Sequence, residues 1–516
     1  MVVNGKSDLA GVTVSAPEPL AKSPDESTEF RLFLDLGGTK VDGQKASQQM
    51  QVEYADLMRA TFQAARPNST ESSSGNDEAS LFDRSLVEVG QIDQNSTVDI
   101  TNLDGVHFKI EHPELNLDDL IESIIDLASF EPTVPTENTD FLDALRSVSI
   151  KTPNSIAISR PFGALEARVE SKDGWSWEGD IKGDNIEGAL SMKPRAEAGF
   201  YGFDLSRLVI GPEGENPPAL EPIDKSLQPA DYPAIKLSID SFRMDGRNLG
   251  ALDFYGEPKD EKWSLEKFAL VHNGIRTTAT GGWGNDQEQG SLTAFDVNTT
   301  IDEAEGVLTD MDFDGYVKKG NGSLSGLIEW RGAPHEFDYS RLNGKFDLFV
   351  KDGELVQVEP GTGKLLGLLN FNAIARRLVF DFRDLFASGL QFDRMRYRGL
   401  LSNGEAILQD AYILTPAVFV RMEGKLDLDK ELIDMDVHIS PELGGNLTLL
   451  SALANPTAGA VVFITSQLFK DDMRRASFVS YQAKGTWEDF EMVEIDSEGV
   501  PLDQQQAKSE QSESRP

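Results

Sequence analysis

The chain has 516 residues, enough for several ordinary domains or for one very elongated domain. Its formal net charge is −39, and this disfavours nucleic acid and anionic lipid as broad electrostatic partners, because both require a basic surface. The absence of cysteine excludes disulfides, zinc–thiolate sites and cysteine nucleophiles.

The N-terminal third mixes irregular stretches with one clear strand pattern. Residues 1–28 are polar, contain no basic segment followed by an apolar core, and are predicted to be irregular. Such a start predicts either a cytosolic chain or a chain that lacks the N-terminal part of a longer protein. The FRLFLDL stretch, residues 30–36, predicts a strand, and the serine-rich residues 66–80 predict a flexible loop. LNLDDLIESIIDLASF, residues 115–130, places its leucines and isoleucines on one helical face and predicts a short amphipathic helix.

Most of the remaining chain alternates apolar and polar residues with period two. This pattern is typical of strands with one apolar and one wet face. It is clearest in three stretches, beginning at Ile235, Phe346 and Ile433. The Asn-Gly pairs at Asn273, Asn343 and Asn403 are hairpin signals between such strands.

A weak internal repeat supports a modular sheet. FGALEARVESKDGW (residues 162–175) aligns with LGALDFYGEPKDEKW (residues 249–263). In each copy a Gly-Ala-Leu strand is followed by an acidic turn and then by a tryptophan that opens the next strand. A single repeat pair is modest evidence for a solenoid-like arrangement, and coincidence in a glycine-rich β protein is the alternative.

Several short motifs imitate catalytic or ligand-binding sites without their partners. LDLGGTK (residues 34–40) resembles the phosphate loop of sugar kinases, but the chain after it lacks α/β units. PGTGK (residues 360–364) lacks the first glycine and the final Ser or Thr of a P-loop, and DMDFDG (residues 310–315) lacks the last ligand of an EF-hand. The five histidines form no metal or triad pattern and are interpreted as surface or loop residues. Nothing here indicates an enzyme, a metal or a cofactor.

Two apolar segments lie near the C-terminus. Residues 361–382 predict a short apolar helix that ends at Arg376 and Arg377. Residues 443–469 carry no charge, but Pro456 interrupts them, so neither half is long enough to span a bilayer. We expect a broken helix or helical hairpin, either packed on a sheet or lying at a membrane interface, with a true span as the less favoured alternative. Residues 496–516 predict a disordered tail.

These segments also carry a family resemblance. EPGTGKLLGLLNFNAIARRLVFDFRDLFASGLQFDRM (residues 359–395) resembles the C-terminal part of the YhdP family of AsmA-like proteins. Residues 326–355 and 468–490 are similar to further parts of that family, in the same order. The resemblance is strong over residues 230–495 and looser over residues 1–230.

The resemblance implies a bridge-like lipid transfer protein of Gram-negative bacteria. Family members are anchored in the inner membrane by an N-terminal helix, cross the periplasm as a long curved β-sheet with an apolar groove, and approach the outer membrane with their C-terminal end. The expected fold is therefore mainly β, an elongated, curved antiparallel sheet with a few short amphipathic helices near the C-terminus. The expected division is 1–65 as the start of a truncated groove region, 66–80 as a loop, 81–340 as repeated groove, 341–495 as the C-terminal groove with two apolar helices, and 496–516 as the tail.

The leading hypothesis is transport of phospholipid between the inner and outer membranes, with no nucleic-acid partner and no cofactor. The groove would be lined by apolar positions of the alternating strands: Ile235, Leu237, Phe346, Leu348, Val418, Val420, Ile433, Met435, Val437 and Ile439. The two apolar segments would dock on a membrane through Leu365, Leu366, Leu368, Leu369, Phe371, Leu449, Leu450, Val461, Val462, Phe463, Ile464 and Leu468. The alternative of a different class is a non-catalytic scaffold for envelope assembly, whose apolar face would be closed and packed.

Overall fold

A computed structural model describes most of the predicted sheet. The described residues are 2–14, 20–36, 48–63, 84–90, 92, 99–120, 144–157, 160–171, 173–194, 199–211, 228–286, 290–305, 317–355, 390–416, 418–440, 479–487, 490–496 and 500–502. They divide into two compact units. Unit 1 comprises Met1–Pro222 and Asp231–Gly246, and unit 2 comprises Ile223–Ala230 and Arg247–Pro516.

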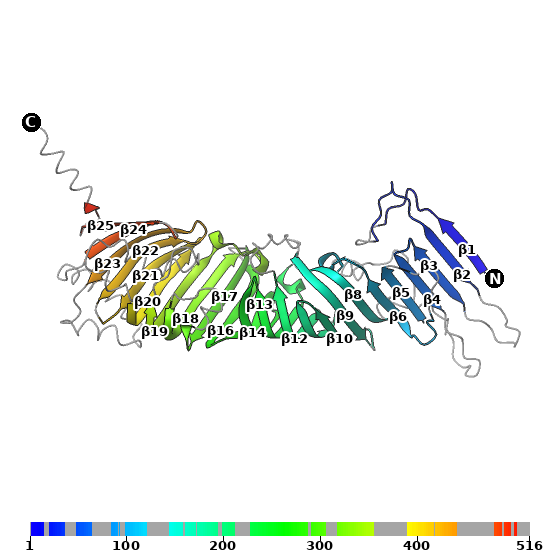
Figure 1. Ribbon diagram of the computed structural model, residues 1–516, viewed down its shortest axis with the longest axis horizontal. Helices are drawn as coiled ribbons and strands as arrows, with labels where there is room; N and C mark the ends of the chain where they lie inside the picture. Colours follow the sequence, from blue (N-terminus) through cyan, green and yellow to red (C-terminus); the bar gives the residue numbers. More distant parts are fainter. Residues whose placement is uncertain are drawn as a thin grey trace, which may run out of the picture. The chain divides into compact units, whose positions relative to one another are not determined.

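Unit 1 is a mixed sheet, drawn from blue to green in Figure 1. Its strands are β1 (Val2–Ser7), β2 (Phe30–Asp35), β3 (Gln49–Tyr54), β4 (Met58–Gln63), β5 (Arg84–Gly90), β6 (Gly105–Glu111), β7 (Leu115–Asn116), β8 (Leu145–Ala157), β9 (Arg160–Ser171), β10 (Trp177–Gly183), β11 (Ile186–Met192), β12 (Phe200–Ile210) and β13 (Ala234–Met244). Neighbours from β1 to β5 and from β8 to β12 pair antiparallel.

The expected antiparallel sheet is confirmed only in part for unit 1, because some of its strands pair in parallel. Strand β6 pairs parallel with both β5 and β8, β7 pairs parallel with β8, and β12 pairs parallel with β13. A parallel pair requires the chain to cross back to the edge from which the first strand began. The alternation of apolar and polar residues does not reveal this crossing of the chain, because a strand has the same pattern in either direction.

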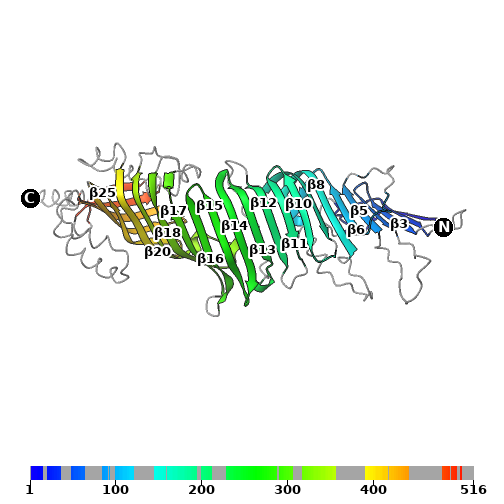
Figure 2. The same cartoon turned by 90° about the horizontal axis from the view of Figure 1, so that it is seen from below.

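Unit 2 is an antiparallel sheet. Its strands are β14 (Arg247–Lys259), β15 (Lys262–His272), β16 (Ile275–Asp286), β17 (Gly290–Ile301), β18 (Val317–Arg331), β19 (Asn343–Leu355), β20 (Leu390–Ser402), β21 (Glu405–Leu414), β22 (Phe419–Asp427), β23 (Leu432–Ser440), β24 (Val479–Thr486) and β25 (Phe490–Ile495). Each strand pairs with the next in sequence. Figures 1 and 2 show these strands side by side in one layer, and the principal contacts between described elements are those of ladder neighbours.

Helical structure is sparse within the described residues. Three 3-10 turns are present: η1 (Pro229–Asp231), η2 (Pro334–Glu336) and η3 (Tyr339–Arg341). Of the helix expected over residues 115–130, only its beginning is described: 115–116 form β7 and 117–120 are helical. Both apolar C-terminal segments, and the loop expected over residues 66–80, lie outside the described residues. The division predicted from the sequence stays a prediction.

Local turn chemistry explains two of the three expected hairpins. Asn273-Gly274 and Asn403-Gly404 join consecutive strands, and both residues of each pair have positive φ, as a type I′ turn requires. The third expectation is wrong, because Asn343 and Gly344 are the first residues of β19, where Asn343 pairs with β18 and Gly344 pairs with both β18 and β20. Residues 1–28 are also not wholly irregular, since Val2–Ser7 form β1 against β2.

The internal repeat is visible in the backbone. Gly163 and Gly250 occupy the same position of the two copies, with φ of +81° and +83°, and the leucine two residues later is buried in each copy. The tryptophans differ from the expectation. Trp263 opens β15 and is buried, whereas Trp175 precedes β10 with 57% of its surface exposed. In the first copy Trp177 is the buried tryptophan that opens a strand.

The curvature of unit 2 is accommodated by glycines that lie beneath aromatic rings. A Cβ on Gly353 would meet Phe392 Cζ at 2.4 Å, one on Gly399 would meet Phe346 Cζ at 2.8 Å, and one on Gly256 would overlap the Trp263 ring. Side chains crowd on the inner side of a curved sheet, so a residue without a Cβ lets a neighbouring ring lie flat.

The outer face of unit 2 carries cross-strand ion pairs. Lys484 Nζ lies 3.1 Å from Asp434 Oδ2, and Lys425 Nζ lies 2.7 Å from Glu405 Oε1. Arg396 binds Asp347 through two nitrogens, at 2.9 and 2.6 Å. Exposed ion pairs contribute little to stability because water screens them, so the main effect of these charges is to keep this face in water.

The pKa values of Asp347 and His438, which both lie on this outer face, differ from those of the free side chains. Burial alone would raise the pKa of Asp347, but the hydrogen bonds and charges of Arg396 and Arg398 outweigh it and hold the pKa below its usual value. Burial lowers the pKa of His438 despite the opposing carboxylate of Glu423. The folded chain therefore holds His438 as a neutral imidazole, with Nδ1 2.8 Å from Ser480 Oγ.

This arrangement predicts how stability depends on pH. Because the folded pKa of His438 is lowered, the unfolded state binds its proton first as the pH falls, and the free energy of unfolding decreases from about pH 6.5 downward. His438→Gln removes the titration and retains an amide for Ser480. We expect the free energy of unfolding to fall less in this variant than in the wild type between about pH 7 and pH 5 in urea titrations. Parallel pH profiles for the two chains would contradict this assignment.

The ring-on-glycine packing gives a second prediction. Gly353→Ala should lower the free energy of unfolding by about 1–3 kcal/mol in urea titrations, because the new methyl group displaces a buried ring. Adding Phe392→Leu should relieve the overlap, so the double variant loses less than the sum of the two single losses. Strictly additive losses would show that the ring and the glycine are not coupled.

Candidate functional site

The candidate site is the apolar face of the sheet in unit 2. Residues paired directly across neighbouring strands project from the same face, so the register can be followed from strand to strand. One such row runs from β16 to β25 with only apolar residues and glycine: Ala279, Val297, Gly326, Phe346, Gly399, Leu408, Gly424, Met435, Ala483 and Met492.

A second row beside it has the same character. It comprises Ile275, Ile301, Gly322, Val350, Met395, Ile413, Val420, Ile439 and Val479. A third set of in-phase residues, including Leu324, Leu348, Tyr397 and Val437, lies between these rows on the same face, whereas the alternate positions project to the outer face, where the ion pairs lie. The two rows define what we call the apolar face of unit 2.

Unit 1 carries an equivalent apolar face. Its central row is Leu32, Val52, Ala60, Val87, Phe108, Val148, Val169, Gly179, Leu190, Phe203 and Leu237. The row passes through the parallel pairs β5–β6, β6–β8 and β12–β13 without losing its phase. The same segregation of polarity is therefore achieved in both units by different strand topologies.

β-Bulges preserve the apolar face where the alternation of the sequence slips. Leu408 and Ala411 are three residues apart, yet both belong to the buried cluster, because the register shifts between them. The pairing of β20 with β21 shifts at the same place, between Arg398 and Gly399. An extra residue in one strand restores the phase that a plain period of two would lose.

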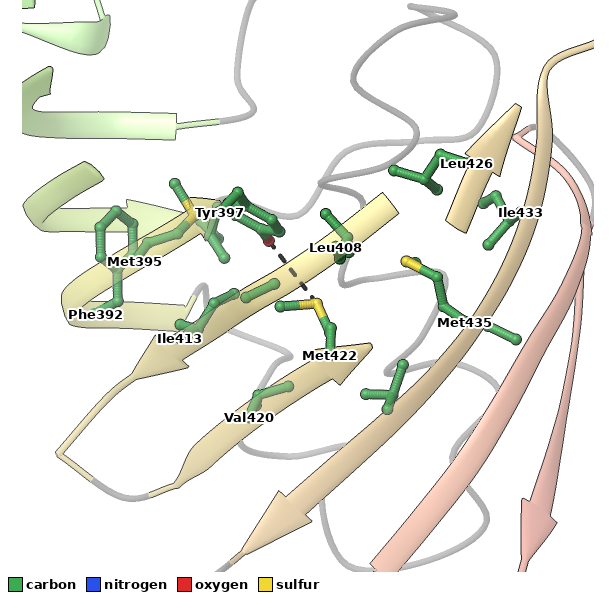
Figure 3. Close-up of a cluster of buried hydrophobic side chains, with 14 of the residues drawn as sticks. Phe392, Met395, Tyr397, Leu408, Ile413, Val420, Met422, Leu426, Ile433 and Met435 are labelled. Atoms are coloured by element: carbon green, nitrogen blue, oxygen red, sulfur yellow. Dashed lines mark hydrogen bonds between the residues drawn. The ribbon is translucent and has the colours of Figure 1, made fainter. Parts of the chain in front are cut away.

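The apolar face of unit 2 has an open section and a closed section. In the open section, β15 to β19, central side chains such as Leu270, Val297 and Leu324 are half-buried. In the closed section, β20 to β24, Met395 is 2% exposed and Ile413 and Val437 have no exposed surface. Figure 3 shows the Tyr397 side chain of β20 directed at Met422 of β22, within a cluster that extends from Met395 to Met435.

Four hydroxyl groups on this face are bonded within the protein. The Thr277 and Thr299 hydroxyl oxygens lie 3.0 Å apart, and Thr293 donates to the Gly332 carbonyl at 2.7 Å. Tyr397 donates to the Met422 sulfur at 4.0 Å, and burial raises its pKa. Such a face offers contact to hydrocarbon and no hydrogen-bonding pattern that would select a polar ligand.

The structure places the predicted lining residues in three groups. Ile433, Met435, Val437 and Ile439 of β23, with Val418 and Val420, belong to the buried cluster of the closed section. Phe346 and Leu348 of β19 are half-buried and pack against that cluster. Ile235 and Leu237 lie on β13 and belong to the apolar face of unit 1. Their role as a lining of a lipid path remains a proposal.

The residues predicted to dock on a membrane, in segments 361–382 and 443–469, lie outside the described residues. Where the structure is described, no helix is both long and apolar enough to cross a bilayer. In the same part of the chain, no group of three or more His, Asp or Glu side chains is placed to hold a metal ion.

Sequence reasoning missed an aromatic border on this face. Trp263 pairs with Trp283, which pairs with Thr293, which in turn pairs with Trp330. All of these residues lie near the edge of the sheet where β14–β15, β16–β17 and β18–β19 are joined. The available signal was a tryptophan near a strand end in each of β15, β16 and β18, which the repeat revealed only at Trp263.

Comparison with known proteins places the chain in a family. A model of the YhdP protein family matches residues 2–490. The "Intermembrane phospholipid transporter YhdP" of Escherichia coli (strain K12) is 29% identical over 234 residues, which cover 44% of this chain and 18% of that protein. No solved structure matches the chain. Because the family model matches well over half of its length, the chain belongs to the YhdP protein family.

Proposed function

We propose that this chain forms part of a conduit that carries phospholipid between the inner and outer membranes of a Gram-negative envelope. The acyl chains would move along the apolar faces of units 1 and 2. The observation that carries this proposal is the row of apolar residues and glycine that continues, one residue per strand, from Ala279 to Met492. The E. coli relative, named an intermembrane phospholipid transporter, supports the same activity for this chain.

The energetics of transfer explain why such a face would be sufficient. A phospholipid in water exposes two acyl chains, and at ~0.8 kcal/mol per CH₂ about 30 such groups cost roughly 24 kcal/mol. An apolar surface that accompanies the chains removes most of that barrier. No bond is made or broken, so the proposed activity requires no catalytic group.

The open section is the part of unit 2 best suited to hold an acyl chain. Its apolar side chains keep some exposed surface, whereas those of the closed section already contact protein on every side. The hydroxyls of Thr277, Thr293 and Thr299 are hydrogen-bonded within the protein, so contact with the lipid would come through hydrocarbon. The head group would remain toward water.

The resemblance to the family supports further proposals about the location of the protein and its membrane contacts. We propose a periplasmic location, with the full-length protein anchored in the inner membrane and the C-terminal end near the outer membrane. The apolar segments 361–382 and 443–469 would contact that membrane. These proposals extend to the whole protein, of which the aligned region represents 18% in the E. coli relative.

One observation favours the alternative of a non-catalytic envelope scaffold. In the closed section the apolar face is packed, with Val437 and Ile439 fully buried. A scaffold would have this packing along the entire sheet, whereas a conduit requires the half-buried positions of the open section to bind hydrocarbon. The two functions therefore differ in whether the open section holds lipid.

The test is an organic extract of the purified full chain, examined by mass spectrometry for phospholipid. We expect bound phospholipid in the wild type and a clear loss in Val297→Asp, which places a carboxylate on the open section. A charge there is costly next to an acyl chain but can remain hydrated in the lipid-free protein. Val437→Asp is a poorer probe, since its carboxylate would be fully buried and would unfold the strand.

The matched control is Asn298→Asp, which adds the same carboxylate one residue later, on the exposed outer face of β17. It should retain the lipid of the wild type. Equal loss in both variants would attribute the effect to charge or stability rather than to the apolar face. A folded wild-type chain without phospholipid would favour the scaffold.

A further inference from the structure

A cluster of aromatic side chains leads from the apolar face of unit 2 to solvent. Phe295, on the open section, lies 5.8 Å from Trp330, measured between ring centroids. Trp330 meets Phe337 edge to face at 5.2 Å, and Phe337 meets Tyr339 in the same way at 5.0 Å. Exposure rises along this path, from 5% for Trp330 to 43% for Phe337 and 50% for Tyr339.

The segment that presents these rings is held by its own hydrogen bonds. Trp330 Nε1 donates to the Ala333 carbonyl at 3.0 Å, and the Ala333 amide donates to Glu336 Oε2 at 2.9 Å. The Ser340 amide donates to Asp338 Oδ1 at 2.8 Å. The aromatic rings are therefore exposed by a segment that is held in place by its own hydrogen bonds.

The segment that presents the rings carries little net charge, although the whole chain is strongly acidic, because its two carboxylates, Glu336 and Asp338, are accompanied by Arg341. The carboxylates of Glu336 and Asp338 are occupied by backbone amides, and Arg341 lies 3.5 Å from Asp338. A zwitterionic head-group layer would meet little net charge at this point. Aromatic side chains with an apolar body, together with the polar tip of tyrosine, are suited to the boundary between head groups and hydrocarbon.

The cluster stands where the open section ends. Beyond β19, the side chains of Met395, Ile413 and Val437 leave no exposed surface for a second molecule. An acyl chain that follows the half-buried positions toward β19 therefore has to leave the apolar face at the side of the sheet. The short connection between β18 and β19, which carries Phe337 and Tyr339, borders that place.

From these observations we propose that Trp330, Phe337 and Tyr339 form a lateral mouth that docks on a phospholipid bilayer surface. Acyl chains would pass there between the bilayer and the open section. This inference rests on the proposed function, and it identifies the surface through which the chain would exchange lipid with the bilayer. The occupant is a bilayer surface, because the exposed rings continue directly into a face suited to hydrocarbon.

The experiment measures flotation of the full chain with neutral phosphatidylcholine vesicles, together with the phospholipid that the chain retains on purification. Phe337→Ser combined with Tyr339→Ser should weaken vesicle binding about tenfold. Both side chains are largely exposed, so the variant should keep the thermal transition of the wild type. Phe337→Trp combined with Tyr339→Trp should restore binding, since it returns aromatic surface without the original side chains.

A matched control is available on the outer face. Leu400 and Ile407 are directly paired and are 41% and 38% exposed, so Leu400→Ser with Ile407→Ser removes a similar apolar area away from the cluster. This control should bind vesicles like the wild type. Equal vesicle binding by the mouth variant and the wild type would overturn the mouth. So would binding of the wild type to a protein partner through these rings but not to vesicles.

The two proposals fail in different ways. Retained phospholipid in the mouth variant, together with lost vesicle binding, supports the mouth. Retained phospholipid with unchanged vesicle binding overturns the mouth and leaves the conduit intact. Absence of phospholipid from the wild type overturns the conduit, whatever the vesicles show.

Discussion

The constraint on which this structure depends is the cross-strand register that keeps residues of like polarity on one face. A slip of one residue would carry the apolar set of a strand to the outer face, among carboxylates and lysines. The slip would also separate pairs such as Asp434 and Lys484 from their present neighbours. Burial of apolar surface on one face and hydration of charge on the other therefore specify the same register.

A sheet with one apolar face must either cover that face or use it. Unit 2 covers this face in one region and leaves it half-buried in another. Curvature, assisted by glycines beneath rings such as Phe346 and Phe392, brings the side chains of β20 to β24 into mutual contact. Toward β15 to β19 the face retains half-buried leucine, valine and phenylalanine. The proposed lipid path depends on this second region, and the stability of the sheet depends mainly on the first.

The acidic composition can be explained once the two faces of the sheet are known. Charges concentrate on the outer face, where they are hydrated and paired across strands. Net negative charge keeps a half-apolar sheet soluble and opposes edge-to-edge association. Where the chain would need to approach a membrane, at Phe337 and Tyr339, the nearby carboxylates of Glu336 and Asp338 accept hydrogen bonds from backbone amides.

The sequence by itself determined the mainly β class, the strands around Ile235, Phe346 and Ile433, and two of the turns, because period-two alternation and Asn-Gly pairs act over a few residues. It also carried the family resemblance. Only the tertiary structure decided which strands pair in parallel, where bulges such as that between Leu408 and Ala411 restore the phase, and which apolar residues are closed or open. These properties depend on contacts between residues distant in the chain, and alternation is the same for a fully buried Val437 and a half-buried Val297.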